Sequence, residues 1–239
     1  MWRSRKDTSV SDSGNQRSLT GWVARLTGLA WPARDEPDPE SSPDGVVHRS
    51  RALPHFLKAM RHRAAPVLVD LGPAIGENVT LLGDQLGCKV HIEHLFGDGT
   101  RSNLDRRASE NCADLPIAFA YPANSIDGVL CWDVLDYLSP AAAGRLVAEL
   151  SRVLKPGGVG MAIFTTNHAP EPGYRKYVIV DVQHLRQRDY PAATGPRRLW
   201  TSRDVHLMMS KLEVDESYLL KHRQRETLFH KPIRAGDRG

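Results

Sequence analysis

Residues 67–78, VLVDLGPAIGEN, decide the fold of this chain. The apolar run at residues 66–71 is typical of a strand buried on both faces of a sheet. The apolar spacing of residues 77–86 predicts a helix. Gly72 and Gly76 lie in the turn between them, where Gly72 lets a ligand approach the backbone and Gly76 lets the helix start pack against the strand. We therefore expect a ligand site at the carboxyl end of this strand, the usual crevice of an open α/β sheet.

Strand and helix patterns alternate on both sides of this segment. Helical spacing places Leu53, Phe56, Leu57 and Met60 on one face, and a second helix begins at Ser139-Pro140 and stops at Lys155-Pro156-Gly157-Gly158. Further strands are predicted at residues 89–96, 125–132, 159–165, 212–221 and 225–230, with a helix at 202–211. The last two strands are joined by about three residues, too few for a parallel crossover. The pattern predicts a doubly wound α/β fold whose mostly parallel sheet ends in an antiparallel hairpin.

The composition describes a folded domain with extensions at its ends. The chain has 239 residues, of which 41% are hydrophobic and 25% charged, and this excludes a wholly disordered chain. We expect residues 1–45 to form a flexible extension with a short amphipathic helix and an acidic, Pro-rich linker, residues 46–232 the domain, and residues 233–239 a tail. The net charge of +4 permits an anionic partner without requiring one.

The same sequence contains no targeting or membrane signal that we recognise. The N-terminus is polar, and no apolar run approaches the roughly 18 residues that a membrane-spanning helix needs. The three cysteines, Cys88, Cys112 and Cys131, have no CxxC spacing and suit a reducing compartment. We therefore expect a cytoplasmic protein that does not bind membranes, whose oligomeric state stays open.

An acidic residue follows the glycine turn at an informative distance. Glu93 lies 21 positions after Gly72 and is expected at the tip of the neighbouring strand. A carboxylate there can accept two hydrogen bonds from a ribose diol. Nucleotide cofactors and S-adenosylmethionine (SAM) both carry such a diol. Glu93 could instead be a solvated charge at a strand end.

These motifs together resemble a known family. VDLGPAIGEN, Glu93, SIDGVLCWDVLDYL and the LKPGG turn are similar to the motifs of class I SAM-dependent methyltransferases. The resemblance covers about residues 46–232. It implies a Rossmann-like, seven-stranded sheet of order 3-2-1-4-5-7-6 with the seventh strand antiparallel. It also implies that Asp70, Gly72 and Gly76 line the methionine side of SAM and that Glu93 holds the ribose.

The sequence departs from the family pattern at three points. Ala74 stands where the family often has a glycine. Asn111, followed by Cys112, stands where an Asp often meets the adenine amine, so the resemblance places these two residues at the adenine. No Asn-Pro-Pro-Tyr follows the strand at 125–132, which argues against adenine-N6 or glutamine-amide methylation.

The residues after that strand are the candidates for chemistry. Asp133 lies where the family's substrates enter, so it could be a general base or a substrate anchor, or it could cap the next helical turn. Trp132 could be a packing residue or a stacking platform. His91, Glu93 and His94 form no metal site in our interpretation, because strand alternation points His94 away from the other two.

A stretch rich in Arg, Tyr and Pro, residues 174–200, separates the strand at 159–165 from the last predicted helix. Its cations could bind an anionic substrate, or the stretch could be a solvated basic loop. These cations are Arg175, Lys176, Arg186, Arg188, Arg197 and Arg198.

The sequence favours an enzyme that transfers a methyl group from SAM to an unidentified acceptor. A small molecule is the favoured acceptor, with protein and RNA left open, and Asp133 is the candidate base. The alternatives are a non-catalytic, methyltransferase-like scaffold and a nicotinamide-dependent oxidoreductase. The LKPGG turn and the terminal hairpin argue against the oxidoreductase, which requires neither.

Overall fold

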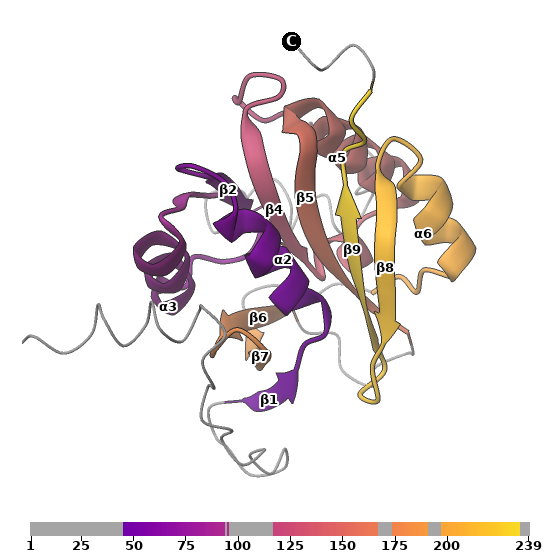
Figure 1. Ribbon diagram of the computed structural model, residues 1–239. Coiled ribbons are helices and arrows are strands. Elements are labelled where there is room, and N and C mark those ends of the chain that lie inside the picture. Colours follow the sequence, from indigo (N-terminus) through magenta and orange to yellow (C-terminus); the bar gives the residue numbers. More distant parts are fainter. Residues whose placement is uncertain (1–44, 94, 96–116, 167–173, 191–196, 235–239) are drawn as a thin grey trace, which may run out of the picture. The chain divides into compact units, whose positions relative to one another are not determined.

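The main sheet of the domain is mostly parallel. The computed structural model describes residues 45–93, 95, 117–166, 174–190 and 197–234. Within them the sheet has the order β3-β2-β4-β5-β9-β8 (Figure 1). Its strands are β2 (Val67–Asp70), β3 (Lys89–Ile92), β4 (Ile126–Trp132), β5 (Leu154–Thr165), β8 (Glu213–Leu219) and β9 (Gln224–His230). Strand β9 runs antiparallel to both of its neighbours, β5 and β8, and the other neighbouring strands of this sheet are parallel.

The α/β fold predicted from the sequence is therefore confirmed. The observed order is the one implied by the family resemblance for six of its seven strands, and the terminal hairpin is β8–β9. The family's third strand would fall near residues 96–116, which lie outside the described part of the chain.

Helices and apolar side chains cover both faces of the main sheet. The helices are α2 (Ala52–Arg61), α3 (Gly76–Thr80), α5 (Pro140–Val153) and α6 (Ser202–Met208). Leu68 and Leu130 face a core formed with α2, whereas Val69 and Val129 face a core formed with α5 and α6. This alternation along each strand is what a sheet buried on both faces requires.

Helix boundaries follow local chemistry, with two departures from the predictions. The Ser139 hydroxyl accepts a hydrogen bond from the Ala142 backbone N–H at 3.2 Å, so the predicted cap of α5 is confirmed. The helix expected at 77–86 is instead α3 followed by a π-helical turn, Leu81–Gln85. Strand β5 begins earlier than expected: Ile126 pairs with Leu154 but Gly128 with Val159, so the Lys-Pro-Gly-Gly segment bulges from the strand.

A second sheet accounts for much of the basic stretch. It has the order β1-β7-β6, with β1 (Val46–Arg49), β6 (Tyr174–Ile179) and β7 (His184–Tyr190). The interpretation of these residues as a solvated loop is thus wrong for 174–179 and 184–190. Figure 1 shows this sheet beside the end of the main sheet at which β5 finishes.

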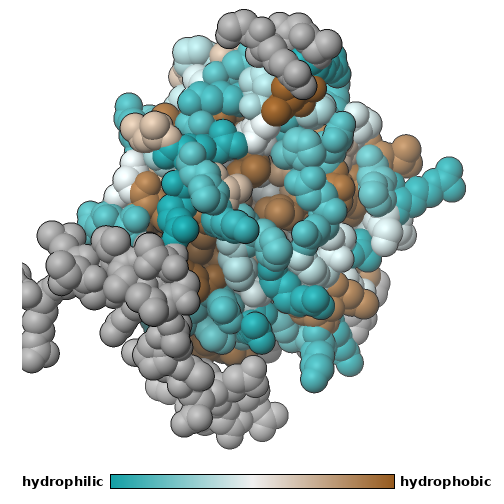
Figure 2. All heavy atoms as spheres, viewed as in Figure 1, coloured by the Kyte–Doolittle hydropathy of each residue, from teal (hydrophilic) through white to brown (hydrophobic). Residues whose placement is uncertain are grey.

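The surface in view is mostly hydrophilic. Figure 2 shows apolar side chains there only in small groups among hydrophilic ones, as is normal for a protein surface. Among the helices that the structure describes, none is both long and apolar enough to cross a membrane.

Candidate functional site

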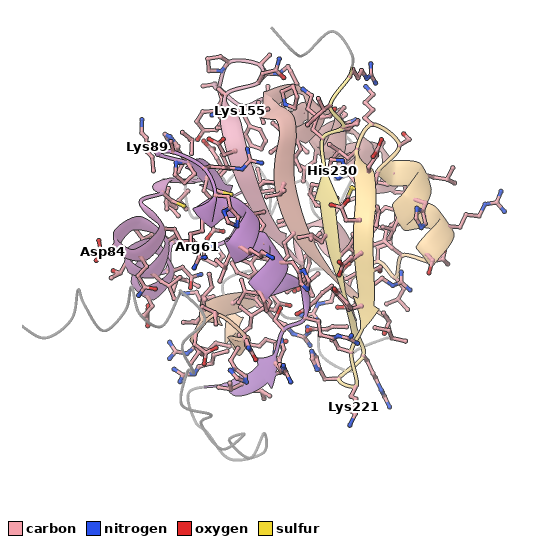
Figure 3. The ribbon with its side chains drawn as sticks, in the orientation of Figure 1. Arg61, Asp84, Lys89, Lys155, Lys221 and His230 are labelled. Carbon is pink, nitrogen blue, oxygen red and sulfur yellow. The ribbon has the colours of Figure 1, made fainter. Side chains whose placement is uncertain are left out.

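The parallel strands bring three predicted site residues to one edge of the main sheet. Asp70 ends β2, Glu93 follows β3, and Asp133 follows β4. Strands β2 and β3 are in register there, since the Glu93 backbone N–H donates to the Asp70 carbonyl at 2.8 Å. We call this the carboxyl edge. In Figure 3, Lys221 marks this edge and Lys89 and Lys155 mark the opposite one.

Asp70 holds the glycine turn in place. Its Oδ1 accepts hydrogen bonds from the Gly72 backbone N–H at 2.8 Å and from Trp132 Nε1 at 2.6 Å. The side chain is buried, and this burial raises the pKa of Asp70 to about 6, although both hydrogen bonds act to lower it. Asp70 therefore ties β2, the turn and β4 together.

The two glycines of the turn have different surroundings. A Cβ on Gly72 would lie 2.7 Å from Cδ1 and 2.9 Å from Nε1 of Trp132, so the indole packs directly against this glycine. A Cβ on Gly76 would meet nothing within 4 Å. The open space that the sequence leads us to expect above Gly72 is thus filled by Trp132.

Trp132 is both a packing residue and a stacking partner. Its ring stacks on Tyr177 of β6, with 5.4 Å between the centroids and 4° between the planes. Tyr177 is in turn held at its hydroxyl, which donates to Asp133 Oδ2 and accepts from Gln224 Nε2, both at 3.2 Å. The second sheet therefore reaches the glycine turn through Tyr177.

Glu93 has a different, half-buried environment. The Tyr121 hydroxyl donates to Glu93 Oε1 at 2.5 Å, and the ring of His91 meets that of Tyr121 edge-on at 5.1 Å. Burial, this hydrogen bond and the charge of Glu93 together raise the pKa of Tyr121, so its proton stays on the phenol. Oε2 of Glu93 accepts no hydrogen bond from the described residues.

Asp133 is fully buried without capping the helical turn that follows it. The 3-10 turn Val134–Tyr137 has no side-chain cap, so the interpretation of Asp133 as a helix cap is wrong. Burial raises the pKa of Asp133 to about 6, although Arg197 and Arg175 lower it. Its Oδ1 has no hydrogen-bond partner among the described residues. A carboxylate with this pKa can take up a proton near neutral pH.

Asp136 is a second buried acid beside Asp133. Its Oδ2 accepts from the Thr165 backbone N–H at 2.8 Å. Burial first, and then the charge of Asp133, hold the pKa of Asp136 well above its usual range. Arg197, one of the predicted anion-binding cations, donates from Nε to the Tyr137 hydroxyl at 2.7 Å.

Some of the residues discussed from the sequence lie outside the described part of the chain. Asn111, Cys112 and His94 fall in the part of the chain that the structure does not describe. Among the described residues, no group of three His, Cys, Asp or Glu side chains could hold a metal ion.

Four residues of the site's surroundings were missed by the sequence analysis. They are Asn78, Tyr121, Tyr177 and Gln224. Tyr177 had a weak signal, because buried Tyr177 and Ile179 flank Val178 in a short apolar run that is typical of a strand. The partners of the other three come from distant parts of the chain, and no local pattern indicates them.

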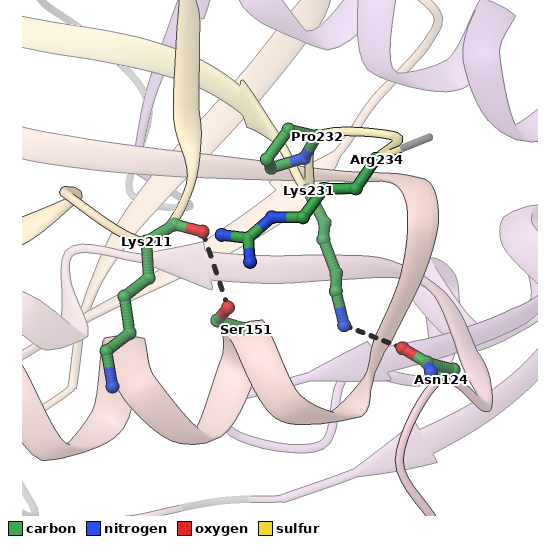
Figure 4. A pocket seen from close by; sticks show the side chains of 6 residues that line it. All are labelled: Asn124, Ser151, Lys211, Lys231, Pro232 and Arg234. Atoms are coloured by element: carbon green, nitrogen blue, oxygen red, sulfur yellow. Dashed lines mark hydrogen bonds between the residues drawn. The ribbon is translucent and has the colours of Figure 1, made fainter. Parts of the chain in front are cut away.

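A basic pocket lies at the opposite edge of the main sheet (Figure 4). It has a volume of about 420 Å³. Its lining residues are Asn124, Ser151, Lys211, Lys231, Pro232 and Arg234. Lys231 Nζ donates to Asn124 Oδ1 at 2.6 Å. None of the predicted site residues lines this pocket, so it is separate from the carboxyl edge.

Comparison with known proteins identifies the central segment. Residues 69–162 match the family model of a methyltransferase domain. The resemblance predicted from the sequence is therefore confirmed for the segment from β2 to β5. No curated protein matches the chain at a significant level.

Several solved structures are similar over most of the domain. A SAM-dependent methyltransferase from Methanosarcina mazei is 13% identical, with a TM-score of 0.47 over 77% of this chain and 99% of that one. A didemethyltoxoflavin N1-methyltransferase from Burkholderia thailandensis, solved with S-adenosylhomocysteine, is 18% identical, with a TM-score of 0.46 over 77% and 78%. The [4+2]-cyclase SpnF is 14% identical, with a TM-score of 0.47 over 77% and 82%. At these TM-scores the likenesses carry no argument about function.

Proposed function

We propose that this protein is a SAM-dependent methyltransferase that binds its cofactor at the carboxyl edge of the main sheet. The observation that carries the proposal is the pairing of the Asp70–Gly72 turn with Glu93 on the adjacent parallel strand. The family match over residues 69–162 supports it.

The residues at the ribose end fit the cofactor. Glu93 is half-buried at a strand tip, and Tyr121 fixes one carboxylate oxygen while the other has no partner among the described residues. Two acceptor oxygens in this position suit a ribose diol. Near Gly76 the start of α3 is open. On the methionine side, the fit requires Trp132 to leave Gly72.

Bound SAM supplies an electrophilic methyl group on a sulfonium. The residues of the chain bind the two substrates and accept a proton where the acceptor must lose one. Glu93 binds the ribose, and Asp70 keeps the turn in its ligand-binding shape. Asp133 accepts a proton at Oδ1 from an acceptor that must lose one. Positioning two substrates can itself supply much of the rate enhancement.

The acceptor we favour is a small molecule. Asp133, the candidate base, is buried beside Tyr177, and a small molecule can reach such a group more readily than a macromolecule. We place the protein in the cytoplasm, where the described cysteines, Cys88 and Cys131, would stay free as they are here.

A second candidate function is a non-catalytic, methyltransferase-like scaffold. The specific observation in its favour is the Trp132 indole against Gly72, which leaves no room for a ligand on that side as folded. Measured binding of the cofactor separates the two candidates.

The test is calorimetric titration of SAM and S-adenosylhomocysteine into the full-length protein. Glu93→Ala should weaken binding about 10- to 100-fold, because it removes hydrogen bonds to a charged acceptor. Glu93→Gln keeps one acceptor and should lose less. Asp84→Ala is the control, since it removes the same charge from an exposed site away from the edge (Figure 3). Absence of binding to the wild type at millimolar ligand would reject the enzyme in favour of the scaffold.

A further inference from the structure

We propose that Trp132 closes the methionine side of the cofactor site from within. As folded, the site takes the nucleoside part of its ligand and admits the full-length cofactor only when the indole moves away from Asp70. This inference rests on the proposed function and makes a separate statement about how the site is reached.

The first argument is steric. Glycine at a strand-to-helix turn leaves room for a ligand where a side chain would block it. At Gly72 that room is already taken, because Trp132 Cδ1 lies 2.7 Å from where a Cβ would stand. A ligand cannot share this space with the indole.

The second argument is that the indole is held there by specific contacts. Trp132 Nε1 donates to Asp70 Oδ1 at 2.6 Å inside the protein, where both residues are buried. Its ring stacks on that of Tyr177 with the two planes nearly parallel. Each contact ends on a residue that is itself fixed: Asp70 also binds the turn, and Tyr177 also binds Asp133.

The third argument comes from the backbone. Trp132 has φ +48°, in the left-handed region that bulky residues rarely adopt. The pairing of β4 with β5 also shifts register between Leu130 and Trp132. Such strain persists only where surrounding contacts hold it, and it concentrates at clamps and switches. Releasing the indole from Asp70 would let this residue relax.

The fourth argument is the contrast with the ribose end. Glu93 is half-buried, and Tyr121 and His91 stand beside it at one side. The structure therefore has one accessible half of the site, with a carboxylate for a diol, and one filled half. The ribose of a nucleoside needs only the accessible half.

The experiment compares two ligands on matched proteins. Adenosine and S-adenosylhomocysteine are titrated calorimetrically into full-length wild type, Trp132→Ala, Trp132→Phe and Trp200→Phe. Trp200 is the control because it is also buried and its Nε1 also donates one hydrogen bond, to the Leu135 carbonyl, in the other core. Melting curves confirm that each variant is folded.

For the wild type we expect the two ligands to bind within about 3-fold of each other, because the homocysteine part finds no room. Trp132→Ala should bind S-adenosylhomocysteine at least about 10-fold more tightly than wild type, with adenosine nearly unchanged. Trp132→Phe keeps the ring but loses the bond to Asp70, so its gain should be several-fold. Trp200→Phe should behave as wild type.

Three results would overturn the inference. The first is that wild type binds S-adenosylhomocysteine about 10-fold or more tightly than adenosine. The second is that the Trp132 variants bind S-adenosylhomocysteine no more tightly than wild type does. In either case Trp132 does not block the methionine side, while the proposed function stands. If Trp132→Ala does not fold, Trp132→Phe alone decides. If neither ligand binds any of the proteins, the proposed function fails and the inference with it.

Discussion

Three buried carboxyl groups give the carboxyl edge its chemistry at the scale of single residues. Asp70, Asp133 and Asp136 are each almost wholly removed from solvent, and burial raises the pKa of all three. Their partners differ. Asp70 accepts hydrogen bonds from Gly72 in the glycine turn and from Trp132, and Asp136 accepts one from the Thr165 backbone N–H. Asp133 alone combines a position after β4 with a pKa suited to proton transfer.

Asp133→Asn should lower turnover more than it lowers cofactor affinity. Removing a general base typically costs about 10²–10⁴-fold in rate, whereas the proposed ribose contact at Glu93 is unchanged in this variant. The measurement is the turnover number beside calorimetric affinity for S-adenosylhomocysteine, once an acceptor is found. Equal losses of turnover and of affinity, or an unchanged turnover number, would show that Asp133 is not the general base.

The same residue should leave a signature in the pH dependence of stability. The folded-state pKa of about 6 lies above the unfolded value near 3.8, so the folded state holds this proton more tightly. Such a group contributes stability below about pH 4, and this contribution is lost as the pH rises through 6. The free energy of unfolding of wild type relative to Asp133→Asn should therefore fall by about 2 kcal/mol between pH 4 and pH 7. Urea denaturation of both proteins at several pH values measures it, and a flat difference would contradict the burial of an ionisable Asp133.

At the scale of elements, the side-chain amide of Asn78 joins α3, the helix that follows the glycine turn, to strand β6 of the second sheet. Asn78 of α3 donates from Nδ2 to the Tyr177 carbonyl at 2.8 Å and accepts at Oδ1 from the Ile179 N–H at 2.7 Å. Its side chain thus pairs with β6 as a neighbouring strand would. This contact sets where β6 lies and so places Tyr177 over Trp132.

Asn78→Ala should destabilise the domain by about 2–4 kcal/mol, because it leaves two buried backbone groups without partners. Ser151→Ala is a matched control, since its hydroxyl also bonds one backbone carbonyl, that of Lys211, but at an exposed site. The control should change stability by less than about 0.5 kcal/mol. Chemical denaturation of both variants gives the comparison. Similar small losses of unfolding free energy in the Asn78 and Ser151 variants would show that Asn78 does not fix the position of β6.

At the scale of the whole domain, the residues from Gly45 onward include all the described strands and both cores. Strand β1 pairs with β7 along its length, and the Ser50 N–H donates to the Gln183 carbonyl at 2.7 Å. The domain therefore needs its chain from about residue 45.

Deleting residues 1–44 should accordingly lower the melting temperature by only a few degrees. Deleting residues 1–50 also removes β1 and should lower it by more. Differential scanning calorimetry of the two truncated proteins and the full chain is the test. A fall of more than about 10 °C on the first truncation, equivalent to several kcal/mol at this size, would place part of the N-terminal segment in the core.

The sequence predicts the main sheet well because its signals are local. Apolar runs and periodicities at β2, β4 and α5 reflect burial of the same residues in the structure. The second sheet was missed because β1 pairs with residues about 140 positions later, and such pairing leaves no local pattern. Likewise, the Arg51 and Ala52 N–H groups at the start of α2 bind the buried Glu226 of β9, which lies about 175 positions away, and only the Leu53 N–H binds a neighbouring side chain, the Ser50 hydroxyl. At the site, the strand ends could be predicted, but the rotation of Trp132 onto Gly72 could not, since it depends on Asp70 and Tyr177 together.

Hydrogen–deuterium exchange of the full-length protein with and without millimolar S-adenosylhomocysteine tests the central claim most directly, because it locates the ligand on the chain. If the cofactor binds at the carboxyl edge, protection should increase in peptides that contain residues 70–80 and 89–95. The basic pocket at the opposite edge, near Lys211 and Arg234, should be unaffected. Unchanged exchange at the glycine turn and at Glu93, or protection confined to residues 211 and 231–234, would contradict the account.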